Sequence, residues 1–139
     1  MAGGTSGKNM EIKIDHIALW VNDLDRMRNF YREYFNAESG EKYTNPIKEF
    51  SSYFLKLGGS VKLELMHNPH VPGRTVGEHF EMGLAHLAIS LGTKEKVLEM
   101  TEKIRKAGYG IAGEPRTTGD GYFESVILDP EGNRIELTI

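Results

Sequence analysis

Four residues of this 139-residue sequence carry the side chains of a metal site built from nitrogen and oxygen: His16, Glu64, His86 and Glu136. Imidazole and carboxylate ligands suit borderline to hard divalent ions, and the candidates are Ni²⁺, Zn²⁺, Co²⁺, Mn²⁺ and Fe²⁺. The chain has no cysteine, which excludes thiolate ligands and a cysteine nucleophile. We therefore expect one divalent metal ion, with one or two coordination positions left for water or substrate.

The spacing of these residues indicates an internal duplication. His86 follows His16 by 70 residues, and Glu136 follows Glu64 by 72. In each half, a β-rich run precedes an amphipathic helical segment, and shorter alternating runs follow it. Such a repeat predicts two copies of one supersecondary unit, each with the order β-α-β-β-β. The expected fold is α+β, with two tandem βαβββ modules forming a curved mixed sheet cup and the helices on its convex face.

The module boundaries follow from composition. Residues 10–67 form the first module and residues 83–139 the second, while residues 68–82, which contain Pro69, Pro72, Gly73 and Gly77, form the linker. Residues 1–9 are rich in glycine and serine and are interpreted as a tag or a disordered leader. Both modules together make one domain, because 139 residues are enough for a single core.

Local signals place the ends of the helices and one hairpin. Asn22 and Thr93 are the expected N-caps, and Gly108 has the position of a glycine after the last helical turn. Gly58 and Gly59 predict a hairpin between residues 50–57 and 60–66. Two sets of side chains are expected on the inner helix faces: Leu24, Met27, Tyr31, Tyr34 and Phe35 in the first helix, and Val97, Leu98, Thr101 and Ile104 in the second.

Strand alternation assigns a face to each candidate ligand. Val61, Leu63 and Leu65 alternate with Glu64, and Ile135, Leu137 and Ile139 alternate with Glu136. His16 and His86 alternate in the same way with apolar neighbours. All four polar side chains are thus expected on the sheet face away from the helices. A lone strand histidine is more often an ordinary hydrogen-bonding residue, but two His–Glu pairs at equivalent positions favour a joint metal site.

Composition restricts the partners. A net charge of −3 does not favour binding to nucleic acid, which basic proteins bind. No apolar run approaches the roughly 20 residues that cross a bilayer. The N-terminus lacks the pattern of a signal peptide. The expectation is a cytoplasmic protein with a small-molecule substrate, no nucleic acid and no membrane.

Five further residues are candidate substrate contacts: Trp20, Asn68, Arg116, Thr118 and Tyr122. Trp20 shares the predicted face of His16, so we expect it to line the cavity wall. Arg116 could clamp a carboxylate or phosphate, although a solvated arginine in a turn is an equally good interpretation.

At these residues the chain closely resembles the vicinal oxygen chelate superfamily of glyoxalase I, bleomycin-resistance proteins and ring-cleaving dioxygenases. The resemblance covers residues 10–139, and the motifs that carry it are DHIALWVNDLDRMRNFY, KLELM, GLAHLAIS and LDPEGNRIEL. The set His16, Glu64, His86 and Glu136 is similar to the ligand set of the glyoxalase I branch. Ring-cleaving dioxygenases and fosfomycin-modifying enzymes use two His and one Glu, so Glu64 favours glyoxalase-like chemistry.

The resemblance implies a metal-dependent lyase or isomerase that acts on a small substrate derived from a 2-oxoaldehyde, such as a thiol adduct, through an enediolate. Glu64 or Glu136 would be the base that moves a carbon-bound proton. Family members often form homodimers, and the long linker permits sites within one chain or across the interface.

Asn68 matches the bacterial glyoxalase I pattern, whereas Trp20 stands where those enzymes carry an arginine for the carboxylate of the thiol cofactor. A fosfomycin-type epoxide-opening enzyme, a dioxygenase and a non-catalytic small-molecule binding protein are the alternatives.

Overall fold

The structure, a computed structural model, describes residues 11–73 and 81–139. The predicted leader at residues 1–9 and the middle of the predicted linker lie outside the described residues. The first half has the elements β1 (His16–Trp20), α2 (Leu24–Phe35), β2 (Glu38–Ser39), β3 (Tyr43–Asn45), β4 (Phe50–Lys56) and β5 (Lys62–His67). The second half has β6 (Leu87–Ser90), α3 (Lys94–Lys106), β7 (Ile111–Thr117), β8 (Phe123–Leu128) and β9 (Arg134–Thr138).

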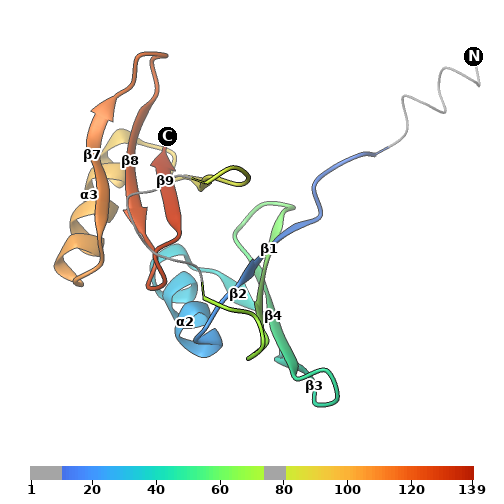
Figure 1. The fold of residues 1–139 in the computed structure, drawn as a ribbon. Helices are drawn as coiled ribbons and strands as arrows, with labels where there is room; N and C mark the ends of the chain where they lie inside the picture. Colours follow the sequence, from blue (N-terminus) through green and yellow to red (C-terminus); the bar gives the residue numbers. More distant parts are fainter. Residues whose placement is uncertain (1–10, 74–80) are drawn as a thin grey trace, which may run out of the picture.

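The strands form two mixed sheets of matching topology. The first has the order β1-β5-β4-β2, with β3 also paired to β4, and the second has the order β6-β9-β8-β7. In each sheet the first strand of the module runs parallel to the last, and the other pairs are antiparallel. Figure 1 shows the two sheets apart from each other, with α2 between them. The predicted α+β class with curved mixed sheets is confirmed, and the predicted cup is divided into two sheets.

Both helices begin at a side-chain cap. The carboxylate of Asp23 accepts a hydrogen bond from the N–H of Arg26 at 3.0 Å, so the predicted N-cap at Asn22 was wrong by one residue. Thr93 caps α3 as predicted, by accepting from the N–H of Lys96 at 3.2 Å. Gly108 follows α3 with a φ of +90°, the left-handed conformation that favours glycine there.

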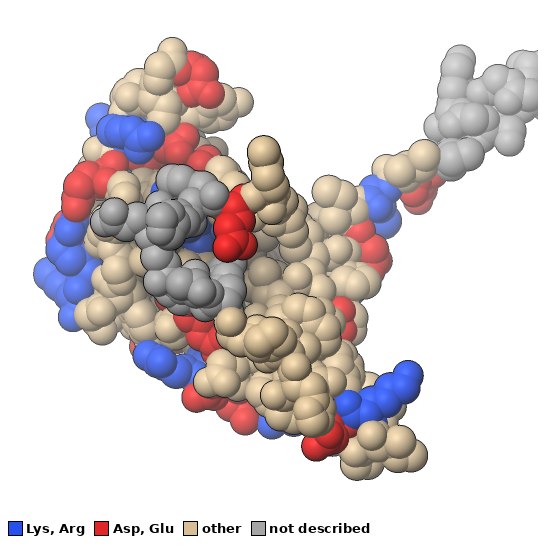
Figure 2. Space-filling view, in the orientation of Figure 1, with Lys and Arg blue, Asp and Glu red and all other residues tan. Residues whose placement is uncertain are grey.

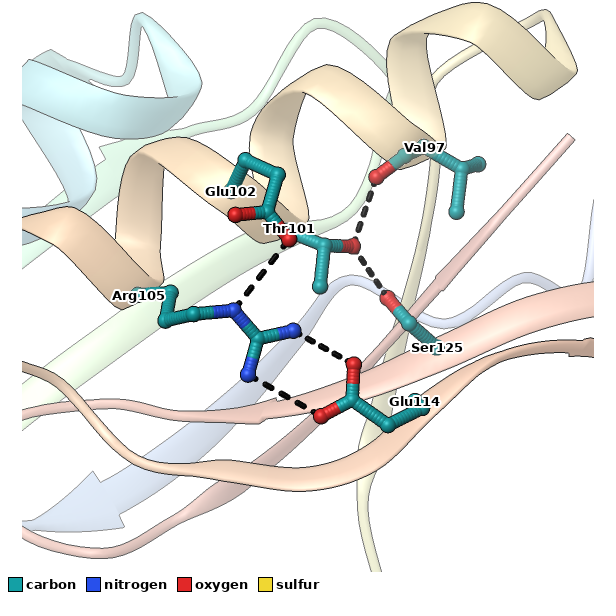
Figure 3. Close-up of polar contacts among 6 residues, drawn as sticks. All are labelled: Val97, Thr101, Glu102, Arg105, Glu114 and Ser125. Atoms are coloured by element: carbon teal, nitrogen blue, oxygen red, sulfur yellow. Dashed lines mark hydrogen bonds and ion pairs between the residues drawn. The ribbon is translucent and has the colours of Figure 1, made fainter.

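The second helix packs on its sheet through three buried residues, Val97, Thr101 and Ile104. Leu98 was expected among them, but its side chain is 42% exposed, because one residue beyond Val97 turns the side chain about 100° around the helix. The buried hydroxyl of Thr101 donates to the carbonyl of Val97 at 2.6 Å and contacts the hydroxyl of Ser125 at 2.8 Å (Figure 3). Both buried hydroxyls are therefore satisfied.

The two modules are joined through α2. The carboxylate of Glu131, in the turn between β8 and β9, accepts from the N–H groups of Asn22 and Asp23 at 2.7 and 2.8 Å. The rings of Phe30 and Tyr109 meet edge to face, with centroids 5.1 Å apart. One hydrophobic core therefore runs from the first sheet across α2 to the second. Within the described residues, neither helix is long and apolar enough to cross a membrane.

A buried hydrogen bond strengthens this junction. The hydroxyl of Tyr31 donates to Oδ2 of Asp129 at 2.8 Å, and both residues are buried. Burial, and then the Asp129 carboxylate, raise the pKa of Tyr31 well above its ordinary value, so Tyr31 stays protonated and continues to donate.

We expect Tyr31→Phe to lower the free energy of unfolding by about 1–2 kcal/mol, because it removes one donor from a buried carboxylate. Urea denaturation followed by circular dichroism measures this difference. Tyr34→Phe, on a more exposed turn of the same helix, is the matched control and should change stability by less than about 0.5 kcal/mol. Equal effects of the two substitutions would contradict a role for the Asp129 contact.

Candidate metal site

The first His–Glu pair lies on the face of the first sheet that α2 does not cover. Leu63 and Leu65, on either side of Glu64, are buried on the helix side. Glu64 lies between Ala18 of β1 and Phe54 of β4 in the strand register. Nε2 of His16 is 3.5 Å from Oε1 of Glu64. The two predicted ligands of the first module therefore lie side by side.

The second pair has the same place in the second sheet. His86 directly precedes β6, and Glu136 lies opposite Ala88 in the register of β6 and β9. Nε2 of His86 is 3.1 Å from Oε2 of Glu136. Ile135 and Leu137 are fully buried on the helix side.

The geometry of each pair fits two ligands of one metal ion. Donor atoms at about 2.1 Å from a metal lie about 3.0 Å apart at octahedral angles and about 3.4 Å apart at tetrahedral ones. The observed separations of 3.5 and 3.1 Å are close to this range. Each pair could therefore supply one imidazole nitrogen and one carboxylate oxygen to a divalent ion.

One chain does not bring the two pairs together. Among residues 11–73 and 81–139, no group of three or more His, Asp or Glu side chains is arranged to hold a metal ion. The reason is the packing of the modules, since they meet through α2 and the β8–β9 turn rather than through the faces that carry the pairs.

Asp15 contacts the first pair and was missed by the sequence reasoning. Nδ1 of His16 donates to Oδ2 of Asp15 at 2.8 Å, and Nζ of Lys62 lies 3.3 Å from the other carboxylate oxygen. The hydrogen bond from His16, followed by the contact with Lys62, holds the pKa of Asp15 below its ordinary value. With Nδ1 bonded in this way, Nε2 is left to act as a ligand. The position of Asp15 directly before His16 in the sequence could have indicated this contact.

Glu124 contacts the second pair and was also missed. It lies on β8, directly opposite Arg116 of β7, and its carboxyl group is close to that of Glu136. Partial burial, and then the neighbouring carboxyl group of Glu136, raise the pKa of Glu124. Strand alternation could have indicated this contact. Val126 lies opposite Glu136, and Glu124, two residues before Val126, lies on the same face of the sheet as Val126 and Glu136.

The predicted substrate contacts fall into two groups. Arg116 lies opposite Glu124 on the neighbouring strand, and Trp20 lies on the same strand and face as His16, four residues further along. The remaining three, Asn68, Thr118 and Tyr122, lie in loops outside the strands.

The side chains of Thr118 and Asn68 form hydrogen bonds to loop residues. The hydroxyl of Thr118 bonds Asp120 and also accepts from the N–H of Tyr122, which closes the turn between β7 and β8. Tyr122 is exposed in this turn. Asn68 accepts from the N–H of His70 at 2.8 Å and donates to the carbonyl of Lys48 at 3.3 Å.

Comparison with known proteins agrees with this fold. The sequence model of the glyoxalase/bleomycin resistance protein/dioxygenase superfamily matches residues 13–137. The chain belongs to this superfamily.

The relatives are mostly lactoylglutathione lyases. The chain is 31% identical to lactoylglutathione lyase GLX1 of Arabidopsis thaliana over 126 residues, which are 88% of this chain and 42% of the plant protein. It thus spans less than half of the plant relatives it matches. Lactoylglutathione lyase of Escherichia coli O157:H7 is 28% identical over 91% of both chains. Among solved structures, glyoxalase I of Zea mays superposes with a TM-score of 0.74 at 28% identity, covering 91% of this chain and 44% of the maize chain.

Proposed function

We propose that this protein is a metal-dependent enzyme of the glyoxalase I type, which isomerises a small substrate derived from a 2-oxoaldehyde, such as a thiol adduct, through an enediolate. The observation that carries this proposal is the pair of His–Glu contacts, each with ligand spacing, at equivalent positions of two modules. The similarity to lactoylglutathione lyases supports the same activity.

The complete site is proposed to form between two copies of the chain. Each chain offers half of the ligand set on each of two sheets, so the first sheet of one copy would face the second sheet of its partner. Apolar side chains beside the pairs, including Ile14, Phe54 and Leu84, are exposed, as expected for surfaces that a homodimer buries. In Figure 2 much of the surface over β1 and β4 is uncharged, and charged side chains gather along the side that carries α3.

In this site the residues would have two roles, metal binding and proton transfer. His16, Glu64, His86 and Glu136 would hold a divalent ion such as Ni²⁺, Zn²⁺, Co²⁺ or Mn²⁺, which when bound supplies Lewis-acid stabilisation of charge on the substrate oxygens. Glu136 is proposed to take the proton from one carbon and return it to its neighbour, and Glu64 is the alternative base. A carboxylate of ordinary pKa, about 4.3, needs such charge stabilisation to deprotonate carbon.

The test begins with metal analysis of the purified protein. It continues with turnover of the methylglyoxal–glutathione hemithioacetal in the presence of Ni²⁺, Co²⁺, Zn²⁺ or Mn²⁺. We expect about one metal ion per chain and turnover with at least one of the ions. Bound metal without turnover under any of these conditions would contradict the glyoxalase assignment.

Asp15→Asn should weaken metal binding about 10- to 100-fold, because it replaces the carboxylate that orients His16. A competitive titration with a chelating dye measures this Kd directly. Glu41→Gln, which removes one acidic charge from an exposed loop of the same module, is the control and should leave the Kd unchanged. An equal loss of affinity in both variants would point to net charge instead of the hydrogen bond.

A further inference from the structure

Three aromatic rings form a continuous surface at one end of the first sheet. Trp20 of β1 meets Phe50 of β4 edge to face, with ring centroids 6.2 Å apart. Phe50 in turn contacts Tyr43 of β3, with centroids 6.1 Å apart. We call Trp20, Tyr43 and Phe50 the aromatic shelf.

The aromatic shelf is accessible in spite of its apolar character. The side chain of Trp20 is 50% exposed and that of Tyr43 is 56% exposed. Rings of this size are normally buried or placed where one edge meets a partner. The shelf thus offers a large apolar area to whatever occupies the space in front of the sheet.

The strand register places the shelf beside the first His–Glu pair. Trp20 lies opposite Met66, and Met66 lies two residues beyond Glu64 on β5. Two residues along a strand correspond to about 7 Å. A group attached to a substrate held at His16 and Glu64 could therefore reach the shelf without leaving the sheet face.

Charge separates the two ends of this face. In the row of His16, Lys62 of β5 lies opposite Lys56 of β4, and Lys56 lies opposite Glu38 of β2. The row that contains Trp20 continues through Met66 and Ser52 to Tyr43, and none of these four residues is charged. The charged side chains therefore lie at the His16 end of this face, and the shelf end fits an uncharged, planar group.

From this arrangement we propose that the aromatic shelf is a specificity subsite, and that the substrate carries an aromatic ring next to its oxygen-bearing carbons. The inference rests on the proposed function, because it places the substrate oxygens at the His–Glu pairs. A partner chain covering the shelf is the competing occupant. It is disfavoured because Trp20 lies on the same sheet face as His16 and Glu64, and a partner that faces this sheet has to leave room there for substrate.

The experiment compares two hydroxy acids on the Zn²⁺-loaded protein. 3-Phenyllactate and lactate share the same vicinal oxygens and differ by one phenyl ring. Trp20 is the only tryptophan of the chain, so its fluorescence reports on the shelf alone. We expect 3-phenyllactate to bind at least about tenfold more tightly than lactate, with a saturable change in Trp20 emission.

Variants distinguish stacking of the ligand on the aromatic shelf from a general loss of ligand binding. Phe50→Leu retains the Trp20 reporter and should remove most of the preference for 3-phenyllactate. Calorimetry should show the preference lost in Trp20→Ala and largely kept in Trp20→Phe, which retains a ring. Leu98→Ala, an exposed apolar position on α3, is the matched control and should leave both affinities unchanged.

Three outcomes would overturn the subsite. Equal affinities for the two acids would reject it while leaving the metal site intact. Trp20 emission that is already protected from acrylamide in the ligand-free protein would show that a second copy covers the shelf. Failure to take up Zn²⁺ at all would reject the proposed function, and the subsite with it.

Discussion

A purified heterodimer of one His16→Ala chain and one His86→Ala chain is expected to bind about one metal ion and to show about half of the activity of the unaltered dimer. In sites shared between copies, one site of this heterodimer loses both histidines, and the other keeps all four ligands. Each homodimer, by contrast, has two sites that lack a histidine. Co-expression with two affinity tags, followed by metal analysis and the turnover assay, measures the recovery.

The matched control is a heterodimer of His16→Ala and Glu64→Ala chains. Both substitutions lie in the first module, so each shared site lacks one ligand and neither site is restored. If instead each chain built its own site, neither heterodimer would recover metal or activity. Recovery in the first heterodimer alone is therefore specific for sites shared between the first sheet of one copy and the second sheet of its partner.

Glu136→Gln is expected to lower kcat by about 10²- to 10⁴-fold while a bound metal ion is retained. The substitution keeps the size of the side chain and removes its basicity, and three of the four ligands remain unaltered. Metal content, KM and kcat measured on the same preparation separate the loss of the base from the loss of the metal. We expect the fall in kcat to exceed any change in metal content.

Glu124→Gln is the matched control, since Glu124 is a second carboxyl group close to Glu136 on the neighbouring strand. It should reduce kcat far less than Glu136→Gln does. If Glu64→Gln abolishes turnover with metal retained, and Glu136→Gln does not, the base is Glu64. An unchanged kcat in both variants would contradict proton transfer by either glutamate.

Much of the fold could be predicted from local pattern. The repeated order of elements and the cap at Thr93 are local properties of the sequence, and the structure confirms them, with β3 as one additional short strand in the first half. The errors were also local and small. Asn22 and Asp23 are adjacent and both are good N-cap residues, so the local sequence does not distinguish between them. Leu98 is apolar but lies at the edge of the buried stripe of α3.

The sequence by itself identified the four candidate ligands, because residue type, strand alternation and the repeat spacing are all encoded along the chain. Only the tertiary structure decided that they form two separate pairs, since this depends on how the modules pack around α2. Asp15 and Glu124 could be recognised as neighbours of the site only from the structure. Carboxylates are common in the sequence, and these two are distinguished only by their closeness to His16 and Glu136. In the same way, Trp20 was expected to line a cavity, and the pairing of β3, β4 and β5 is what joined it to Phe50 and Tyr43.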